Sequence, residues 1–547
     1  MPRLVFLFTL LIAAAARATL LFSTDLMPGM NGAYYLVQAR SLLEKGALAI
    51  PDLPFVFVLH AIAAQALQWL SPLSQSEAVV WAVKVGDSLL PALGVIPVML
   101  LAASWAARGR VNALLAVLAA LLVPASAVAL TMVGDFEKNS LGIALMITLA
   151  WALHEWMNHH GRRRALVAVV LLGLVGITHI GVFGSALILV ATTLAALAVS
   201  QGREGLHKVL RIAVFALPVA LVAGGVVFWK FDPARVRKLL GAISEPTVFL
   251  GSGMMPPGMA DGGLSWFPFV AFAMAVLPGL VIVWWRRHSL PMGSVALITG
   301  AAITVIALTG PWVQGDKMWR LQMNASPLAL LCLLFALLQI RRDGLRAGVG
   351  VLVLGLLLVP SGLRLQAGGH PIITEQAQAE LRDLAASVEE PAQTLVVARH
   401  GLEWWTAWSL HTHIAQAQAL KVEDWQRYKY VWFLEEKASG RGGPPGMIGG
   451  PPGRGPADDS WFGRLMSSVS GGRGPGMRPG GPGGQRNGPP PGMSGPGGGR
   501  GGMPSGMMGV SMPDDAYLLH EGEHFRLGWA KEVPDFVLHP RSNGPRH

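Results

Sequence analysis

Long apolar runs that alternate with short polar loops constrain this chain more than any other feature. A helix needs roughly 17 to 25 mostly apolar residues to cross the hydrocarbon core of a bilayer. Runs of about that kind lie at 4–22, 78–102, 112–132, 140–157, 165–178, 182–200, 212–229, 266–285, 291–310, 325–340 and 347–363. Because 52% of the residues are hydrophobic and only 14% are charged, the chain has too little polar surface for a soluble globule. We therefore predict an all-α polytopic membrane protein with about 11 transmembrane helices.

The composition also excludes other classes of protein. The net charge of +11 could indicate nucleic acid, but the basic residues form short clusters between apolar runs, with no basic stripe containing interleaved aromatic residues. We therefore predict the lipid bilayer, and no nucleic acid, as a partner. The chain has a single cysteine, Cys332, which rules out an intrachain disulfide bond and a thiolate zinc site.

The loops between the runs predict the orientation of the chain. The apolar run from Phe55 to Leu70 is short and polar in places, so we expect it to lie along the membrane surface. The basic clusters then fall on the side of Arg3: Arg108/Arg110, Arg162/Arg163/Arg164, Arg203/Lys208/Arg211, Arg286/Arg287 and Arg341/Arg342/Arg346. Short basic loops stay in the cytoplasm, which predicts a cytoplasmic N-terminus and an outer C-terminal domain. We expect the membrane to be the bacterial inner (plasma) membrane. Residues 1–22 also fit a cleaved signal peptide, although their apolar stretch continues through Phe22, which favours a retained span.

The apolar runs stop at the end of a transmembrane domain predicted at 1–364, and residues 365–547 show the signals of a small α/β domain. We predict helices at 373–389 and 403–419 and strands at 394–398 and 428–434, followed by two strands in "DAYLLHEGEHFRLGWA". Between them, residues 438–512 are rich in Gly, Pro, Met and Arg. Such a composition buries too little apolar surface to offset chain entropy, so we predict a disordered insertion.

The first outer loop, with interfacial helices predicted at 33–70, carries a recognisable series of residues. An amphipathic helix is predicted over Tyr34 to Lys45, and a proline-rich step and a second helix follow from Pro51 to Leu70. The series Tyr34, Tyr35, Ala39, Arg40, Leu42, Leu43 and Gly46 resembles the first outer loop of the GT-C superfamily of membrane glycosyltransferases, among them the protein O-mannosyltransferases and aminoarabinose transferases. The resemblance implies a donor sugar linked to polyprenyl phosphate.

The resemblance also implies site residues in this loop. Where the family places its catalytic aspartate, this chain has Asn31, whose amide cannot take a proton. Asp25, six residues upstream, and Asp52, further on, are the candidates to replace it as catalytic acid or base, and helix capping or solvation is the alternative role for Asp25. Expected substrate-binding residues in this loop are Asn31, Tyr34, Tyr35, Arg40 and Asp52.

The second outer loop, "MVGDFEKNSLG", presents Asp135 and Glu137 at the membrane edge. Acids at this depth usually serve a function. The pair is similar to the acidic loop of the oligosaccharyltransferase catalytic subunit, which implies that Asp135 and Glu137 are catalytic and hold Mg²⁺ or Mn²⁺. The alternative, equally weighted here, is that Asp135 caps the next helix.

Polar residues elsewhere give further candidates. Lys317 and Arg320 precede a late span, where a guanidinium suits a lipid-linked phosphate, with snorkelling as the alternative. His179 lies between two spans and is a candidate for substrate binding or a structural residue. Within the spans, we expect Arg17 to reach the headgroups and Lys84 to pair with Asp87 on one helix face.

These patterns together favour a GT-C-type membrane glycosyltransferase that transfers a sugar from a polyprenyl-phosphate-linked donor to an acceptor on the non-cytoplasmic face. The alternative is a non-enzymatic membrane protein, either a transporter or a GT-C-like binding protein that has lost catalysis. A transporter usually contains inverted repeats, and the chain shows no internal repeat.

Overall fold

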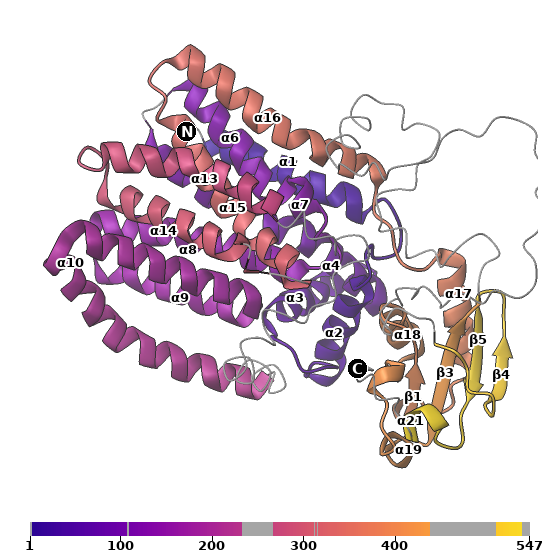
Figure 1. Ribbon diagram of the computed structural model, residues 1–547. Helices are drawn as coiled ribbons and strands as arrows, with labels where there is room; N and C mark the ends of the chain where they lie inside the picture. Colours follow the sequence, from indigo (N-terminus) through magenta and orange to yellow (C-terminus); the bar gives the residue numbers. More distant parts are fainter. Residues whose placement is uncertain are drawn as a thin grey trace, which may run out of the picture.

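Antiparallel apolar helices form a bundle, and an α/β domain is attached to one end of it (Figure 1). The computed structural model describes residues 3–106, 109–231, 266–310, 312–313, 316–437 and 510–538. The helices of the membrane part are α1 (Arg3–Leu21), α2 (Gly32–Lys45), α3 (Phe55–Leu70), α4 (Gln75–Ala92), α5 (Val95–Trp105), α6 (Arg110–Ala125), α7 (Ala127–Leu130), α8 (Glu137–His159), α9 (Arg162–Thr178), α10 (Ile180–Phe231), α13 (Trp266–Arg286), α14 (Met292–Thr309), α15 (Asp316–Leu338) and α16 (Asp343–Ala367).

The predicted fold class is confirmed. Within the described ranges, nine helical segments are long and apolar enough to cross a membrane, with α4 and α5 forming one segment and α6 and α7 another. The two remaining predicted spans correspond to α9, which has 17 residues, and to the second half of α10. Gly202, with φ 62° and ψ −141°, interrupts α10 between its two halves, a backbone conformation open to glycine.

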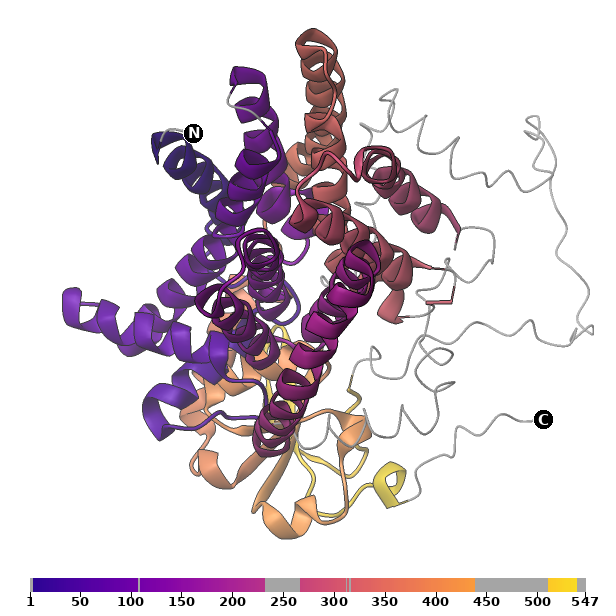
Figure 2. The same cartoon turned by 90° about the vertical axis from the view of Figure 1, so that its left-hand side faces the viewer.

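Two short helices of the first outer loop lie at the end of the bundle that carries the α/β domain (Figures 1 and 2). The predicted interfacial helix over Tyr34 to Lys45 is α2, and Gly46, with φ 65°, ends it by donating its amide to the Leu42 carbonyl. Helix α3 packs against α4 through its buried face. Its far end is apolar and exposed, with Trp69 and Leu70 at 80% and 84% exposure, as expected of a helix that rests on lipid.

The outer domain is a five-stranded sheet covered by short helices. Its elements are α17 (Glu375–Leu384), β1 (Thr394–Val397), α18 (Leu402–Leu410), β2 (His413–Ala415), α19 (Asp424–Arg427), β3 (Tyr430–Glu436), β4 (Tyr517–Glu521), β5 (Phe525–Trp529) and α21 (Asp535–Leu538), with 3₁₀ turns at Ala385–Ser387, Pro391–Gln393 and Ala417–Ala419. The strand order is β2-β1-β3-β5-β4. Strand β1 is parallel to both neighbours, and the β3–β5 and β5–β4 pairs are antiparallel.

The pairing of β3 with β5 joins the sequences on both sides of the predicted insertion in one sheet. The insertion at 438–512 itself lies outside the described residues, apart from its last three positions. The two strands predicted in "DAYLLHEGEHFRLGWA" are confirmed as β4 and β5.

One predicted helix of the outer domain is wrong in length. The helix expected over 403–419 ends at Leu410, because His411 adopts a left-handed conformation with φ 59°. The chain then forms β2, whose residues pair with β1. Hydrogen bonds to the edge of β1 replace the helical hydrogen bonds. This tertiary contact cannot be predicted from the local spacing of apolar residues.

Two hydrophobic cores stabilise the membrane part and its junction with the outer domain. The first lies within the bundle and is built mainly from α5, α6, α8, α14 and α15. The second crosses the junction, since Leu20 and Tyr35 of the membrane part belong to the same buried cluster as Ile372, Trp405 and Phe525. The two parts of the chain therefore share one core.

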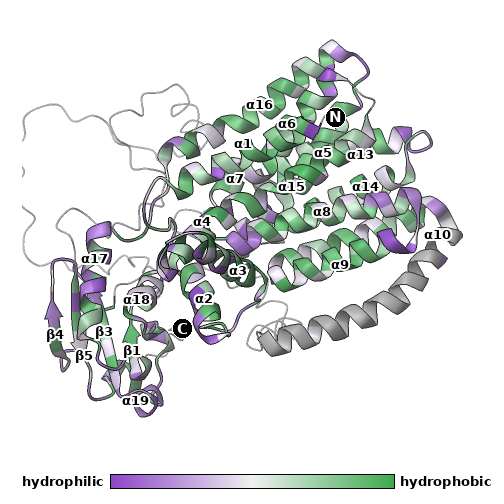
Figure 3. Cartoon of the chain, turned by 180° about the vertical axis from the view of Figure 1, so that it is seen from behind, coloured by the Kyte–Doolittle hydropathy of each residue, from purple (hydrophilic) through white to green (hydrophobic). Residues whose placement is uncertain are grey.

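The basic loops gather at the end of the bundle opposite the outer domain. Because successive helices run in opposite directions, the α8–α9, α13–α14 and α15–α16 connections share that end (Figure 1), which Figure 3 shows as hydrophilic. This is the grouping expected from the sequence, and the cytoplasmic location of that end stays a prediction.

Cysteine labelling tests this orientation. The native Cys332 is fully buried and gives little background. We expect a membrane-impermeant maleimide to label Ser387→Cys, in the outer domain, in intact spheroplasts, and Ser289→Cys, in the α13–α14 turn, only after permeabilisation. Labelling of Ser289→Cys in intact spheroplasts would reverse the orientation.

Candidate functional site

The carboxylate of Asp135 lies where the first and second outer loops meet. Its side chain accepts hydrogen bonds from the backbone amides of Met30 and Asn31, the latter at 2.8 Å. Gly29, with φ 86°, turns the first loop directly over this carboxylate, and a Cβ there would lie 2.6 Å from the Asp135 Cγ. Only glycine combines this conformation with this close approach.

Asp135 does not cap the following helix, so that alternative from the sequence is wrong. Helix α8 has Phe136 at its N-cap position and no side-chain cap. The carboxylate faces the first outer loop instead, and it is half-buried. Burial raises the pKa of the Asp135 carboxyl, and the two amides and nearby cations oppose this shift only in part.

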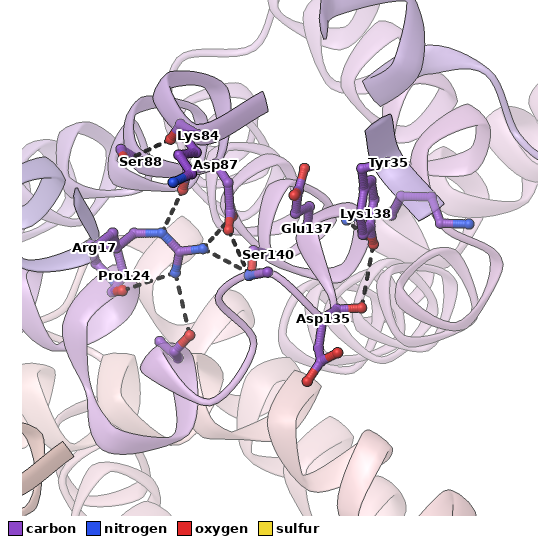
Figure 4. A network of polar contacts seen from close by, with 12 residues as sticks. Arg17, Tyr35, Lys84, Asp87, Ser88, Pro124, Asp135, Glu137, Lys138 and Ser140 are labelled. Atoms are coloured by element: carbon purple, nitrogen blue, oxygen red, sulfur yellow. Dashed lines mark hydrogen bonds and ion pairs between the residues drawn. The ribbon is translucent and has the colours of Figure 1, made fainter. Parts of the chain in front are cut away.

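A buried ion pair fixes the segment that leads to Asp135. Arg17 and Asp87 are both inaccessible to solvent, with 2.5 Å between Arg17 Nη2 and Asp87 Oδ1. Arg17 also donates to the carbonyls of Asp87, Pro124 and Ala129 and to the Ser140 hydroxyl (Figure 4). The guanidinium thus binds groups before and after the second outer loop.

The partner carboxylate extends this network to the residue next to Asp135. Asp87 Oδ2 accepts a hydrogen bond of 2.9 Å from the Gly134 amide. Gly134 has φ 77°, and a Cβ there would lie 2.3 Å from the Pro28 carbonyl oxygen, so no other residue fits this turn. The position of Asp135 therefore depends on a contact that begins in α1 and α4.

Two expectations for these buried residues are wrong. Arg17 does not reach the headgroups, because its side chain is fully buried against Asp87. Lys84 does not pair with Asp87, since its ammonium donates to the backbone carbonyls of Thr24 and Asp25. Lys84 binds these carbonyls of the loop after α1 because Arg17 already neutralises Asp87.

Glu137 points away from Asp135 and is enclosed (Figure 4). It is 2% exposed, and neither oxygen has a hydrogen-bond partner within the described part of the chain. His60 of α3, also buried, lies 3.4 Å from Glu137 Oε2. Gly86 of α4 makes room for this imidazole, because a Cβ there would lie 2.8 Å from the ring.

The other polar residues of the first outer loop tie elements together. Asp52 is 2% exposed, forms an ion pair with Lys138 and accepts a hydrogen bond from the Tyr34 hydroxyl. The Tyr35 hydroxyl lies 3.5 Å from the backbone carbonyl of Asp135, a long contact. Burial raises the pKa of Tyr35, which keeps its phenol protonated as a donor.

Arg40 joins the first outer loop to the outer domain. Its guanidinium donates to the carbonyls of Ala407 and Trp408 at 2.8 and 2.7 Å and lies 4.5 Å from the centre of the Trp408 ring. These carbonyls are at the C-terminal end of α18, where a cation is stabilised by the helix dipole. The expected substrate-binding role of Arg40 has no support in these contacts.

Two cationic side chains lie near Asp135. His400 of the outer domain and Arg364 of α16 are both close enough to interact electrostatically with its carboxylate. The hydrogen bond between His400 Nδ1 and Glu403 Oε1, at 2.9 Å, raises the pKa of His400 and favours its charged form. These groups come from different elements and converge at the junction of the two domains.

Arg320 of α15 lies beside the ring of Phe136. Its guanidinium is 5.7 Å from the centre of the Phe136 ring, and Phe136 follows Asp135 in the chain. Phe136 also packs edge-on against Trp319, with 5.2 Å between ring centres. The structure thus places the expected phosphate-binding arginine beside the residue that follows the expected acid.

Two expected site residues, Asp25 and His179, lie away from Asp135, and the structure does not describe the side chain of a third, Lys317. Asp25 is exposed and lines a separate cavity with residues of α4 and α17. His179 Nδ1 accepts the amide of Val182 at 3.2 Å and so caps α10, which supports its structural interpretation. The side chain of Lys317 lies outside the described residues.

The expected Mg²⁺ or Mn²⁺ stays a prediction. Within the ranges that the structure describes, no group of three or more His, Cys, Asp or Glu side chains could hold a metal ion. The carboxylates of Asp135 and Glu137 point in different directions (Figure 4) and do not converge on one position. Two such oxygen donors make a weak site for either cation.

Sequence reasoning missed His400 and Arg364. His400 follows β1, at the carboxyl end of a strand with parallel neighbours, which is where α/β sheets bind ligands. That signal was present in the sequence, because a strand was expected at 394–398. Arg364 is the last basic residue of the last span, and its role depends on the distant Asp135.

No protein-family model matches the chain. A stretch of 90 residues is 30% identical to the sexual differentiation process protein isp4 of Schizosaccharomyces pombe, which covers 16% of this chain and only 11% of that protein. This match shows no family.

Among solved structures, the chain is similar to ArnT from Cupriavidus metallidurans. The apo crystal structure aligns with a TM-score of 0.49 and 13% identity, over 78% of this chain and 92% of that chain. The form bound to undecaprenyl phosphate aligns with the same TM-score and coverage at 14% identity. Similarity at this level does not define the activity of the chain.

The buried ion pair gives a prediction about stability. We expect Asp87→Asn to destabilise the protein by about 3 kcal/mol, because the Arg17 charge would remain buried without its counter-charge. Thermal unfolding in detergent measures the effect. The matched control is Asp343→Asn, which removes an exposed pairing with Arg346 and should change the melting temperature little. Equal melting temperatures for the two variants would contradict the role of Asp87.

Proposed function

We propose that the chain is a membrane glycosyltransferase of the GT-C type, which transfers a sugar from a polyprenyl-phosphate-linked donor to an acceptor on the non-cytoplasmic face. One observation carries the proposal: a half-buried carboxylate, Asp135, lies at the domain junction with His400 and Arg364 beside it. Arg320 approaches the same loop through Phe136. Transfer of a sugar from a lipid-linked phosphate needs a base for the acceptor and cations for the phosphate.

The cations suit the phosphate of the donor. A guanidinium donates in a fixed fork that matches phosphate oxygens, and Arg320 and Arg364 lie near those ends of α15 and α16 that are on the side of the outer domain. In the reaction, the bond from the sugar carbon to the phosphate oxygen breaks and polyprenyl phosphate leaves. Arg320, Arg364 and charged His400 stabilise the negative charge that develops on that leaving group.

Asp135 acts as the general base in this proposal. It takes the proton of the acceptor hydroxyl while the acceptor oxygen forms its bond to the sugar carbon. Asn31, at the position of the family's catalytic aspartate, contributes its backbone amide to Asp135. The acid has thus moved from the first loop to the second. Tyr34, Arg40 and Asp52 support this arrangement by holding the first outer loop in place.

Substitution of the base tests the function. With purified protein in lipid nanodiscs, polyprenyl-phosphate sugars as donors and a membrane extract as the acceptor source, release of polyprenyl phosphate measures turnover. We expect Asp135→Asn to lower kcat by roughly 10² to 10⁴, because the amide cannot take a proton. Asp383→Asn, at an exposed position of α17, should retain wild-type turnover.

Two outcomes would contradict the proposal. Full turnover by a folded Asp135→Asn protein would remove Asp135 as the base, and parallel loss in Asp25→Asn would point to the acid of the first loop. No turnover with any donor would favour a binding or transport protein.

The pH dependence should show two limbs. Activity should fall with decreasing pH as Asp135 becomes protonated, and burial places this limb above the ordinary pKa of aspartate. It should also fall with increasing pH as His400 loses its charge, and the hydrogen bond to Glu403 places this limb above the ordinary pKa of histidine.

His400→Gln isolates the alkaline limb. The variant should turn over more slowly near neutral pH and lose the alkaline limb, as seen in profiles of kcat/KM. His159→Gln, at the opposite end of the bundle, is the control and should keep both limbs. An alkaline limb that persists in His400→Gln would show that another group carries it.

A further inference from the structure

The turn between β1 and α18 carries a hydrogen-bonded cluster around His400. The imidazole Nδ1 donates to Glu403 Oε1 at 2.9 Å. The same carboxylate oxygen accepts from the side-chain amide of Gln416, the residue after β2, at 2.8 Å. The side-chain oxygen of Gln416 in turn accepts from Gln418 at 2.6 Å, which fixes the orientation of the Gln416 amide. One carboxylate oxygen therefore holds both an imidazole and an oriented amide.

These contacts decide which ring nitrogen of His400 carries a proton. A carboxylate only accepts hydrogen bonds, so Nδ1 is the donor to Glu403. Gln416 Nε2 also lies 2.9 Å from Nδ1, and two donors at that distance need the shared acceptor Glu403 Oε1. The other ring nitrogen, Nε2, has no hydrogen bond with the described residues, and the His400 side chain is 38% exposed. Nε2 is thus the nitrogen that remains for a ligand.

Glu403 is enclosed by protein, unlike His400. Its side chain is 3% exposed, and its second oxygen, Oε2, has no hydrogen-bond partner within the described part of the chain. A buried carboxylate is unfavourable unless it is paired with a cation. Its position in the first turn of α18, where the helix dipole stabilises negative charge, offsets part of this cost. The counter-charge comes from His400, so the two side chains depend on each other.

The β1–α18 turn packs directly on the first outer loop. Gly401, next to His400, has φ 91°, and a Cβ there would lie 2.8 Å from Met30 Cγ. Met30 is one of the two residues whose backbone amides donate to Asp135. The turn that carries His400 therefore contacts the segment that holds the candidate base.

We propose that Glu403 and Gln416 are positioning residues for His400. They keep a proton on Nδ1 and fix the orientation of the ring, so that Nε2–H of the charged imidazole donates to the phosphate of the lipid-linked donor. His400 keeps its proton while the bond from the sugar carbon to the phosphate oxygen breaks. The inference rests on the proposed function for the identity of that phosphate, and it adds the groups that orient the histidine.

Three charged groups act on the protonation of His400. Glu403 favours the charged ring through its hydrogen bond and its charge, Asp135 also favours it, and Arg399 opposes it. Arg399 is itself paired with Glu436. Removal of the Glu403 carboxylate is therefore expected to lower the pKa of His400. Because activity requires the charged ring, the alkaline limb should then move to lower pH.

Magic-angle-spinning NMR tests the positioning without turnover. The full chain, labelled with [¹⁵N]histidine, is studied in proteoliposomes, and the His400 signals are those that disappear in His400→Gln. For the neutral ring we expect the proton on Nδ1, although a free histidine side chain in water prefers Nε2. Glu403→Met, which keeps the unbranched shape but has no acceptor oxygen, should shift the proton to Nε2 and lower the pKa of His400. Glu389→Gln, at an exposed position of the outer domain, is the matched control and should change neither.

Binding of polyprenyl phosphate to the same sample separates this inference from the proposed function. The lipid phosphate should shift the Nε2 signal of His400 and leave the Nδ1 signal nearly unchanged. A shift at Nε2 in a protein that turns over no donor would remove glycosyl transfer and retain the oriented histidine. Turnover by the wild type without a shift at Nε2 would overturn the inference and retain the function.

Turnover gives the second measurement. Glu403→Met should lower kcat about tenfold with little change in KM, because a misdirected donor loses its contact with the charge that develops in the transition state. Its alkaline limb should also move to lower pH, a change that a merely structural residue would not produce.

Gln416→Met keeps the inference open to refutation if Glu403→Met does not fold. This variant removes the amide and leaves the carboxylate in place. It should retain the proton on Nδ1 and the alkaline limb, and it should lower kcat several-fold because the ring is held less firmly. A wild-type proton on Nε2, or wild-type kcat in both variants, would overturn the inference.

Discussion

The buried pairing of Arg17 with Asp87 organises the outer end of the bundle. A lone charge in a low-dielectric environment is strongly unfavourable, and here both partners are also fully hydrogen-bonded. Arg17 binds carbonyls before the second outer loop and a hydroxyl after it, and Asp87 holds the Gly134 amide. Two transmembrane helices thereby determine the shape of a loop that neither of them contains.

The candidate site depends on that loop and on the junction above it. The turn at Gly29 closes over Asp135, and His400 approaches from the outer domain. Arg364 approaches the carboxylate from the last helix of the bundle, and Arg320 lies beside the ring of the next residue, Phe136. Segments from the beginning, middle and end of the chain therefore meet at one carboxylate. The short motif of the first outer loop is one part of this site, and the other parts come from distant segments.

Much of this architecture was predictable because it follows local rules. Apolar length gave the bundle, amphipathic spacing gave α2, and the acid at Asp135 and the cation at Arg320 were expected from their place at the membrane edge. The pairing of Arg17 with Asp87 was not predictable, since 70 positions separate them. The local spacing rule favoured Lys84 for Asp87, and tertiary competition decided otherwise. The predicted end of α18 was wrong for the same reason, because the pairing of β2 with β1 is non-local.

The core that crosses the junction has a consequence for how such a chain is assembled. Trp405 and Phe525 are buried together with Leu20 and Tyr35, and Arg40 closes the end of α18 from the membrane side. The outer domain is therefore not an independent folding unit. Produced without the membrane part, it would expose the apolar residues of the shared core to water, and α18 would lose the guanidinium that binds its last carbonyls. An exchange of the outer domain for another domain by recombination would therefore have to replace the first outer loop at the same time.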